Sequence, residues 1–146
     1  MEGSGYVQTL FGRYRRFILP ADRNAWDKFT ISKMKREFCN APIQGTVADA
    51  VNTSIYNLLR ERYTRGLDFK IVMQIHDSLV LMVHKKDVKE VYERVLKRCM
   101  VEDNPIQCKG QEYHFSIDID MAYRWGEPLT ETVARKELGC GLEDLR

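Results

Sequence analysis

The sequence predicts an α+β fold in which a small antiparallel sheet is covered by helices. Two apolar segments, Phe69–Ile75 and 79–83, flank the polar triplet His76-Asp77-Ser78, which is typical of two strands joined by a tight turn. Residues 85–100 carry apolar side chains at helical intervals, whereas residues 115–121 alternate strictly, as in a half-buried strand. Helices and strands that are not regularly interleaved favour the α+β class over a parallel α/β sheet.

The N-terminal half is predicted to form a hairpin followed by two helices. Residues 6–18 are rich in strand-forming residues around Gly12, which predicts the hairpin. A first helix is expected over residues 22–41, and Pro42 should end it, because proline lacks a backbone donor and disfavours helix at the preceding residue. A second helix should then run from Pro42 to about residue 65, with Gly66 as its C-cap.

The C-terminal half is predicted to contain one helix and one strand, followed by a tail. Residues 85–100 form the amphipathic helix, residues 102–111 a loop, and residues 115–121 the strand. At 146 residues the chain suits one compact domain, which we assign to residues 1–126, with residues 127–146 as a tail that adds a short helix at most.

Charge is unevenly distributed along a chain whose formal net charge is only +2. Residues 12–36 carry eight Lys/Arg against two Asp, a local balance of 8 − 2 = +6. Such a run is either a solvated face or a surface for an anionic polymer, and charge alone favours the solvated face.

Cysteine spacing and hydropathy point to a reducing compartment and away from a membrane. None of the four cysteines forms a CxxC pair, which argues against a zinc site and favours free thiols in the cytoplasm. The longest apolar stretch, residues 71–83, is too short to cross a bilayer and contains His76 and Asp77.

Two polar groupings are candidate functional sites. A carboxylate held at a tight turn, as predicted for Asp77, is suited to binding a divalent metal, although a two-metal site needs at least two carboxylates. Spacing alone favours the simpler interpretation that His76 and Asp77 are turn residues. The second grouping, Arg36, Asn40 and Gln44, recurs at every fourth position and offers donors suited to base edges and sugars, or simply a polar helix face.

Three stretches settle the interpretation when they are taken together: GYVQTLFGRYRR at 5–16, REFCNAPIQGTVAD at 36–49, and QIHDSLV at 74–80. In order, spacing and residue type they resemble three motifs of the family A DNA polymerases, the bacterial DNA polymerase I type. Tyr14 replaces one arginine of the first motif, and Ser78 stands where the family usually has glutamate. The resemblance extends from Gly5 to about Gly126, which would make residues 1–126 the C-terminal part of a polymerase palm with adjoining fingers.

The resemblance implies a role for each of these residues. Asp77 would be one of two aspartates that bind Mg²⁺ in a two-metal site, and His76 would lie near the primer terminus. Arg36, Asn40 and Gln44 would contact primer–template DNA near the nascent base pair. The remaining predicted DNA contacts, with the duplex backbone, are Arg13, Arg15 and Arg16.

The family's other metal-binding aspartate and its nucleotide-binding helix lie upstream of these motifs, and neither is in this sequence. We therefore expect a C-terminal fragment of a DNA-directed DNA polymerase that is inactive alone. A complementary polypeptide would complete it and allow it to use deoxynucleoside triphosphates, and dimerisation could cover the apolar surface left by missing strands. The alternative is a non-catalytic DNA-binding or self-associating remnant.

Overall fold

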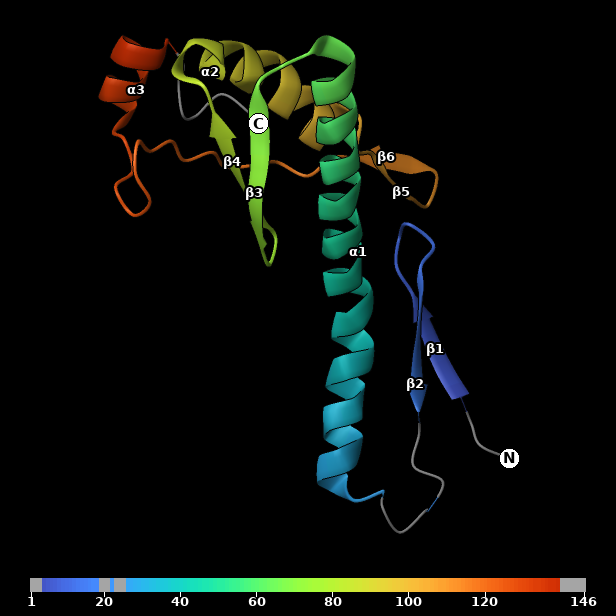
Figure 1. Ribbon diagram of the computed structural model, residues 1–146. Coiled ribbons are helices and arrows are strands. Elements are labelled where there is room, and N and C mark those ends of the chain that lie inside the picture. Colours follow the sequence, from blue (N-terminus) through green and yellow to red (C-terminus); the bar gives the residue numbers. More distant parts are fainter. Residues whose placement is uncertain (1–3, 19–21, 23–25, 140–146) are drawn as a thin grey trace.

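The computed structural model describes residues 4–18, 22 and 26–139, and these form a mixed helix and strand fold around one long helix (Figure 1). The helix α1, Lys28–Arg65, has 38 residues, begins at the N-cap Asp27 and ends at Gly66 in the left-handed conformation. The strands pair as three separate two-stranded antiparallel sheets. The predicted α+β class is therefore confirmed.

The first hairpin confirms the prediction for the N-terminus. Strands β1, Ser4–Gln8, and β2, Tyr14–Ile18, pair antiparallel, with Gly5 opposite Phe17 and Val7 opposite Arg15. Gly12 lies in the connecting turn at φ 89°, a conformation in which glycine has no steric penalty. In Figure 1 this hairpin lies along the N-terminal half of α1.

The predicted helix break at Pro42 is wrong, because α1 continues through this residue. An internal proline costs about 3 kcal/mol, since it removes one helical hydrogen bond and crowds the preceding turn. Contacts with the β1–β2 hairpin lie on both sides of Pro42, at Phe38 and at Asp49, and they offset this cost. Tertiary packing thus overrides a correct local preference.

The second hairpin carries the polar turn that the sequence analysis singled out. Strands β3, Phe69–Ile75, and β4, Ser78–Val83, pair antiparallel, with a register shift between Ile71 and Met73. Ile75 pairs with Ser78, so that only His76 and Asp77 form the turn and β4 begins one residue earlier than predicted.

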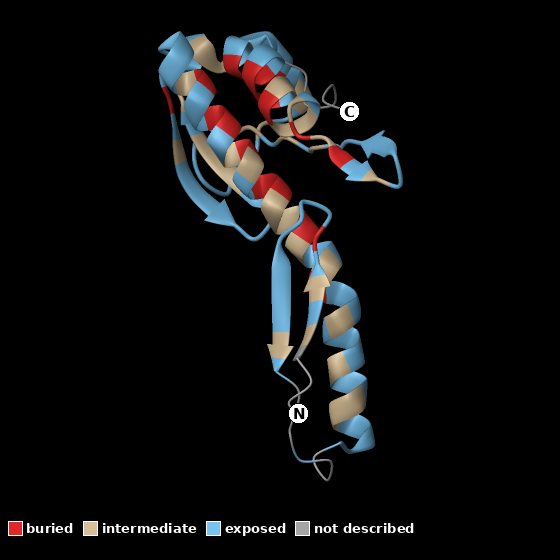
Figure 2. Ribbon diagram, turned by 90° about the vertical axis from the view of Figure 1, so that its right-hand side faces the viewer, coloured by how far each residue is buried: buried red, intermediate tan, exposed pale blue. Residues whose placement is uncertain are grey.

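The predicted amphipathic helix is present as a continuous helical run of three segments. These are a 3₁₀ turn, Lys85–Asp87, then α2, Val88–Glu90, and the π-helical segment η3, Val91–Glu102. Its apolar face meets α1 and β3 in the main core, where the fully buried side chains are Leu58, Phe69, Val91, Val95 and Cys99. Figure 2 shows buried positions along both α1 and the helical run that crosses it.

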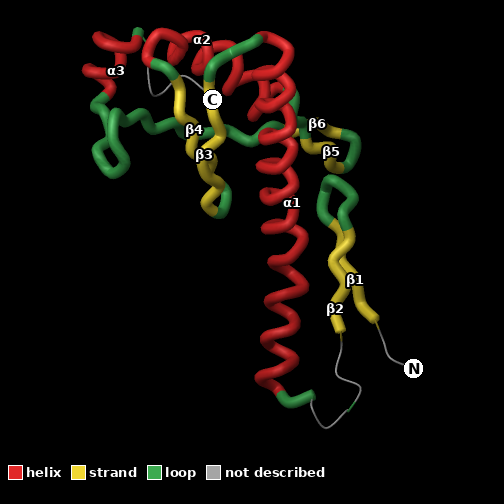
Figure 3. Tube along the Cα trace, in the orientation of Figure 1, coloured by secondary structure: helices red, strands yellow, loops and turns green. Residues whose placement is uncertain are grey.

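Two predictions for the C-terminal half are wrong. The expected loop at 102–111 contains strand β5, Ile106–Cys108, which pairs with β6, Gln111–Tyr113, through a Lys109-Gly110 turn. The expected strand at 115–121 is an extended loop instead (Figure 3). The alternating sequence pattern still corresponds to alternating burial, because Ile117, Ile119 and Met121 pack against the core while the residues between them are exposed. No described strand lies beside it to supply a hydrogen-bonding partner.

The expected short helix of the tail is α3, Glu131–Leu138, in which Ala134 is fully buried and Leu138 packs against the core cluster. The rest of that tail, residues 140–146, lies outside the described residues, as does Cys140. The division of the chain at residue 126 stays a prediction. Among the described residues, no helix is both long enough and apolar enough to span a membrane.

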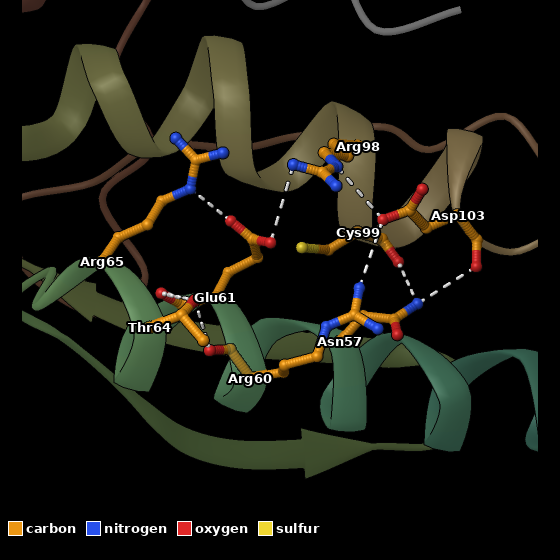
Figure 4. A network of polar contacts seen from close by, with 8 residues as sticks. All are labelled: Asn57, Arg60, Glu61, Thr64, Arg65, Arg98, Cys99 and Asp103. Atoms are coloured by element: carbon orange, nitrogen blue, oxygen red, sulfur yellow. Dashed lines mark hydrogen bonds and ion pairs between the residues drawn. The ribbon is translucent and has the colours of Figure 1, made fainter.

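A polar network fixes the C-terminal half of α1 against η3 (Figure 4). Asn57 Nδ2 donates to the backbone carbonyls of Cys99, at 3.3 Å, and Asp103, at 3.1 Å. The buried Glu61 carboxylate contacts the guanidinium groups of Arg65 and Arg98. Because a buried carboxylate is costly unless it is paired, the contact between Glu61 and Arg98 favours this packing of η3 on α1.

Candidate nucleic-acid interface

The loop between β1 and β2 is bound to α1 through the carboxylate of Asp49. Thr9 Oγ1 donates to Asp49 Oδ2 at 2.7 Å, and Arg13 Nε donates to Asp49 Oδ1 at 2.6 Å. Arg13 Nη2 also donates to the Gly45 carbonyl at 3.2 Å. Both Asp49 and Gly45 belong to the motif at 36–49, so one function of that motif is to hold the hairpin on the helix.

Two small side chains of the same motif allow the backbones to approach closely. The backbone N–H of Leu10 donates to Thr46 Oγ1 at 3.0 Å, and that hydroxyl donates to the Pro42 carbonyl at 2.7 Å. A Cβ at Gly45 would lie 2.6 Å from Thr9 Cγ2, a distance that real Cβ atoms do not show. Glycine is therefore required here for contact with the hairpin, despite its low helix propensity.

A second contact between the hairpin and α1, an apolar one, lies nearer the start of the helix. The ring of Phe38 packs on Phe17 of β2, with ring centroids 4.2 Å apart. A Cβ at Gly5, the partner of Phe17 in β1, would lie 3.3 Å from the Phe38 ring. The hairpin is thus anchored at Phe17 and again at Arg13, and Arg15 lies between the two anchors.

A hollow of about 390 Å³ lies between the Arg13–Asp49 contact and the Phe17–Phe38 contact, on the surface shared by β2 and α1. The residues lining it come from one strand position and one helix face: Arg15, Lys33, Arg36, Glu37, Asn40, Ala41 and Gln44. Ala41 is buried and the others are exposed. Three cationic side chains and one carboxylate give the hollow a formal charge of +2, with two amides beside them, which is a suitable surface for a phosphate–sugar chain.

The structure brings together four of the predicted DNA-contacting residues and leaves two outside this hollow. Arg15, Arg36, Asn40 and Gln44 all line it. The Arg13 guanidinium is engaged by Asp49 and Gly45, although its side chain is half-exposed. Arg16 does not line the hollow, since neighbouring residues of a strand point to opposite faces.

Lys33 and Glu37 also line the hollow, although neither was predicted from the sequence as a site residue. With Arg36, Asn40 and Gln44 they follow the three- and four-residue spacing of a single helix face. That spacing was readable in the sequence, but the face of the helix on which the hairpin docks was not.

His76 and Asp77 lie apart from the hollow, at the tip of the β3–β4 hairpin. Figure 1 shows this hairpin and β1–β2 on opposite sides of α1. Both turn residues are exposed, and His76 adopts φ 52°, a left-handed conformation that is uncommon for a residue other than glycine. The favoured two-residue hairpin turns, types I′ and II′, have a positive φ at the first turn position, where glycine, asparagine or aspartate is preferred.

At this tip the Asp77 carboxylate is the candidate ligand for a divalent metal such as Mg²⁺, which prefers oxygen ligands. Its one hydrogen bond from a side chain comes from Ser78 Oγ, at 3.5 Å, so the carboxylate retains free lone pairs. Among the described residues no group of three or more His, Cys, Asp or Glu side chains could hold a metal ion. A two-metal site does not fit these residues by themselves.

Comparison with known proteins agrees with the motifs. The model of the family described as DNA polymerase family A matches residues 1–127. DNA polymerase I of Chloroflexus aurantiacus is 36% identical over 96 residues, covering 66% of this chain and 10% of that protein. The thermostable DNA polymerase I of Thermus caldophilus is 36% identical over 121 residues, covering 83% of this chain and 13% of that protein. The chain thus spans 10–13% of the length of these curated relatives.

A solved structure is similar as well. It is described as the POL domain of Pol1 from M. smegmatis in complex with DNA primer-template and dNTP. It matches with a TM-score of 0.60 and 29% sequence identity, over 70% of this chain and 17% of that chain. The fold of most of this chain therefore occurs within a polymerase domain.

Proposed function

Because the chain belongs to DNA polymerase family A, we propose that it holds primer–template DNA and supplies one metal-binding carboxylate to a DNA-directed DNA polymerase. The observation that carries the proposal is the hollow, which gathers Arg15, Arg36, Asn40 and Gln44 from two separate motifs onto one surface. The M. smegmatis relative, whose structure is described as holding DNA primer-template and dNTP, supports DNA as the partner.

The chemistry of each group suits its proposed role. Arginine donors bind phosphates through charge, and amides donate to acceptors that the minor groove presents at every base pair. Such contacts hold a duplex without selecting its sequence. Arg13 and Arg16, on the loop and on β2, add positive charge near the same duplex backbone.

Asp77 is proposed to bind one of two Mg²⁺ ions at the nucleotidyl-transfer site, with His76 beside the primer terminus. Two metals need more than one carboxylate, and among the described residues no group of three or more His, Cys, Asp or Glu side chains could hold a metal ion. We therefore propose that this chain is inactive alone, and that a complementary polypeptide completes the site for deoxynucleoside triphosphates. The free thiols of Cys39, Cys99 and Cys108 suit a cytoplasmic setting.

Primer extension tests this proposal. The chain alone should not extend a labelled primer in Mg²⁺, whereas a mixture with a polypeptide carrying the upstream polymerase motifs should extend it. In that mixture Asp77→Asn should reduce the rate at least about a hundredfold, as expected for loss of a metal ligand. Asp68→Asn is the control, because it makes the same change in charge just before β3, away from the turn.

Two outcomes would contradict the proposal. Extension by the lone chain would show that its metal site is complete. A reconstituted Asp77→Asn variant as active as wild type would remove Asp77 from the metal site.

A second candidate function is a DNA-binding module without catalysis. It is favoured by the difference between the two sites, since the hollow is built entirely within this chain and the metal site is not. Tight binding of primer–template DNA, without extension in any mixture, would support this alternative.

Self-association is a third candidate, because Val72, Met73 and Met82 of the β3–β4 hairpin are exposed. Sedimentation of the purified chain would detect dimers.

A further inference from the structure

We infer that Lys33 is an additional phosphate-binding residue of the DNA site, and that Glu37 opposes it by limiting how strongly the hollow binds the DNA backbone. This inference rests on the proposed function of the hollow and extends it to two residues outside the family motifs quoted above. It is supported by the positions of both side chains in the hollow, by their charges and by the lack of an ion pair to either one among the described contacts.

Lys33 lies on the same helix face as the residues already assigned to DNA. Lys33, Arg36, Asn40 and Gln44 follow one another at three- and four-residue intervals on α1, and all four line the hollow. From Lys33 to Gln44 the helix rises roughly 16 Å, at about 1.5 Å per residue. One DNA strand advances about 3.4 Å per phosphate, so this face spans several successive phosphates.

The ammonium group of Lys33 is available for such a contact. Within the part of the chain that the structure describes, no hydrogen bond or ion pair engages the side chain of Lys33, Arg36 or Gln44. Arg13 is different, because Asp49 and the Gly45 carbonyl already engage its guanidinium. An exposed lysine without a partner can bind a phosphate without first breaking a protein contact.

Among the described residues that line the hollow, Glu37 is the one acidic residue. It stands one helical turn after Lys33 and next to Arg36, and it makes no ion pair with either among the described contacts. Its carboxylate therefore lies beside the proposed path of the phosphates without a cationic side chain paired to it among the described contacts. Like charges in that position repel the backbone and weaken binding.

The experiment measures binding of the full chain to a fluorescein-labelled primer–template duplex, by anisotropy over a series of salt concentrations. Lys33→Gln and Glu37→Gln each remove one charge from the same exposed helix face, with opposite signs. Lys97→Gln is the control, because Lys97 is also exposed on a helix but does not line the hollow. Arg36→Gln reports on the hollow itself, and circular dichroism checks that each variant remains folded.

We expect Lys33→Gln to weaken binding and to reduce the slope of log K against log salt by about 0.9, as for the loss of one phosphate contact. The affinity ratio between wild type and this variant should therefore change about eightfold for each tenfold change in salt. Glu37→Gln should tighten binding, and Lys97→Gln should leave both affinity and slope unchanged.

The outcomes separate this inference from the function on which it rests. If Arg36→Gln weakens binding while Lys33→Gln behaves like Lys97→Gln, the inference is wrong and the DNA site stands. If neither Arg36→Gln nor Lys33→Gln alters binding, the proposed DNA site itself is wrong. Weaker binding by Glu37→Gln would overturn the role given to the carboxylate.

Discussion

Arg13 and Asp49 join the N-terminal hairpin to the long helix, with Arg13 Nε 2.6 Å from Asp49 Oδ1. The second carboxylate oxygen accepts from Thr9 at 2.7 Å, so one aspartate binds both ends of the β1–β2 loop. The carboxylate is largely buried, whereas the Arg13 side chain is half-exposed. Asp49 thus determines where the hairpin, and with it Arg15, lies along α1.

Replacing this carboxylate should loosen the hairpin. Asp49→Asn keeps the shape of the side chain but replaces one of the two acceptor oxygens, which bind Thr9 and Arg13 separately, by an NH2 group that can only donate. We expect the free energy of unfolding to fall by about 1–2 kcal/mol, which is typical for a partly exposed, charge-assisted contact. Urea unfolding measures this change, and Asp118→Asn, at an exposed loop position, is the control. Equal stability of the two variants would show that Asp49 does not anchor the hairpin.

Gly45→Ala should destabilise the protein, although alanine is the better helix former by about 1 kcal/mol. The new Cβ would lie 2.6 Å from Thr9 Cγ2, so the hairpin must move away from α1. Overpacking of this kind costs about 1–3 kcal/mol. Thr9→Ser removes the opposing methyl group, and the double variant should recover much of the lost stability. Thermal unfolding of the two single variants and the double variant measures this coupling, and strictly additive losses would contradict it.

The sequence predicted elements whose signals are local. The β1–β2 hairpin follows from alternation around Gly12, and the buried face of residues 85–100 follows from helical spacing. The continuity of α1 was not predictable in this way. The local cost of Pro42 is visible in the sequence, but the contacts that offset it come from Thr9 and Phe17, far from it in the chain.

The candidate site, like the fold, could be predicted from the sequence only in part. The motifs identified Arg15, Arg36, Asn40 and Gln44, but they did not show that the residues share one hollow. Lys33 and Glu37 were missed, because their place in the site depends on how the hairpin docks against α1. For the β5–β6 hairpin the only local signal was Lys109-Gly110, a turn between strands of three residues each.

His76→Gly should stabilise the fold while impairing function. His76 adopts φ 52°, and relieving the left-handed conformation of an L-residue should raise the free energy of unfolding by up to about 1 kcal/mol. Lys109→Gly is the matched control, because Lys109 adopts φ 51° in the β5–β6 turn. Thermal unfolding should show a similar gain for both variants. In the reconstituted polymerase only His76→Gly should slow primer extension, and an equal effect of the two variants would contradict a role for His76 at the primer terminus.

Cys99 should be unreactive and should make stability depend on pH in the alkaline range. Burial, followed by the charges of Glu61 and Asp103, raises the pKa of the Cys99 thiol from 9.0 to about 11. The unfolded chain therefore loses this proton at lower pH than the folded chain. The contribution is fully present below about pH 9 and is lost as pH rises through about pH 11.

The corresponding measurement compares wild type with Cys99→Ala. The stability advantage of the wild type in urea should shrink between pH 8.5 and pH 11. At pH 8 a thiol reagent should modify Cys39, which is exposed, and spare Cys99 in the folded chain. Rapid modification of Cys99 under native conditions would contradict its burial.

His114 should link the β5–β6 hairpin to η3 most strongly when its ring is protonated. Its Nδ1 lies 2.8 Å from the Val101 carbonyl oxygen, and its Nε2 lies 3.1 Å from Glu112 Oε1. Both partners are acceptors, so the two contacts together require an imidazolium ring that donates at both nitrogens. The hydrogen bond to Val101, with smaller contributions from Glu112 and Glu102, raises the pKa of His114 above its ordinary value of 6.5. A raised pKa in the folded state means that this stabilisation is fully present below pH 6.5 and is lost as pH rises through the folded-state pKa.

The stability difference between wild type and His114→Gln should therefore be larger at pH 6 than at pH 8.5 in urea unfolding. An NMR titration of the His114 ring should give a pKa above 6.5, and a lower value would rule out the doubly donating ring.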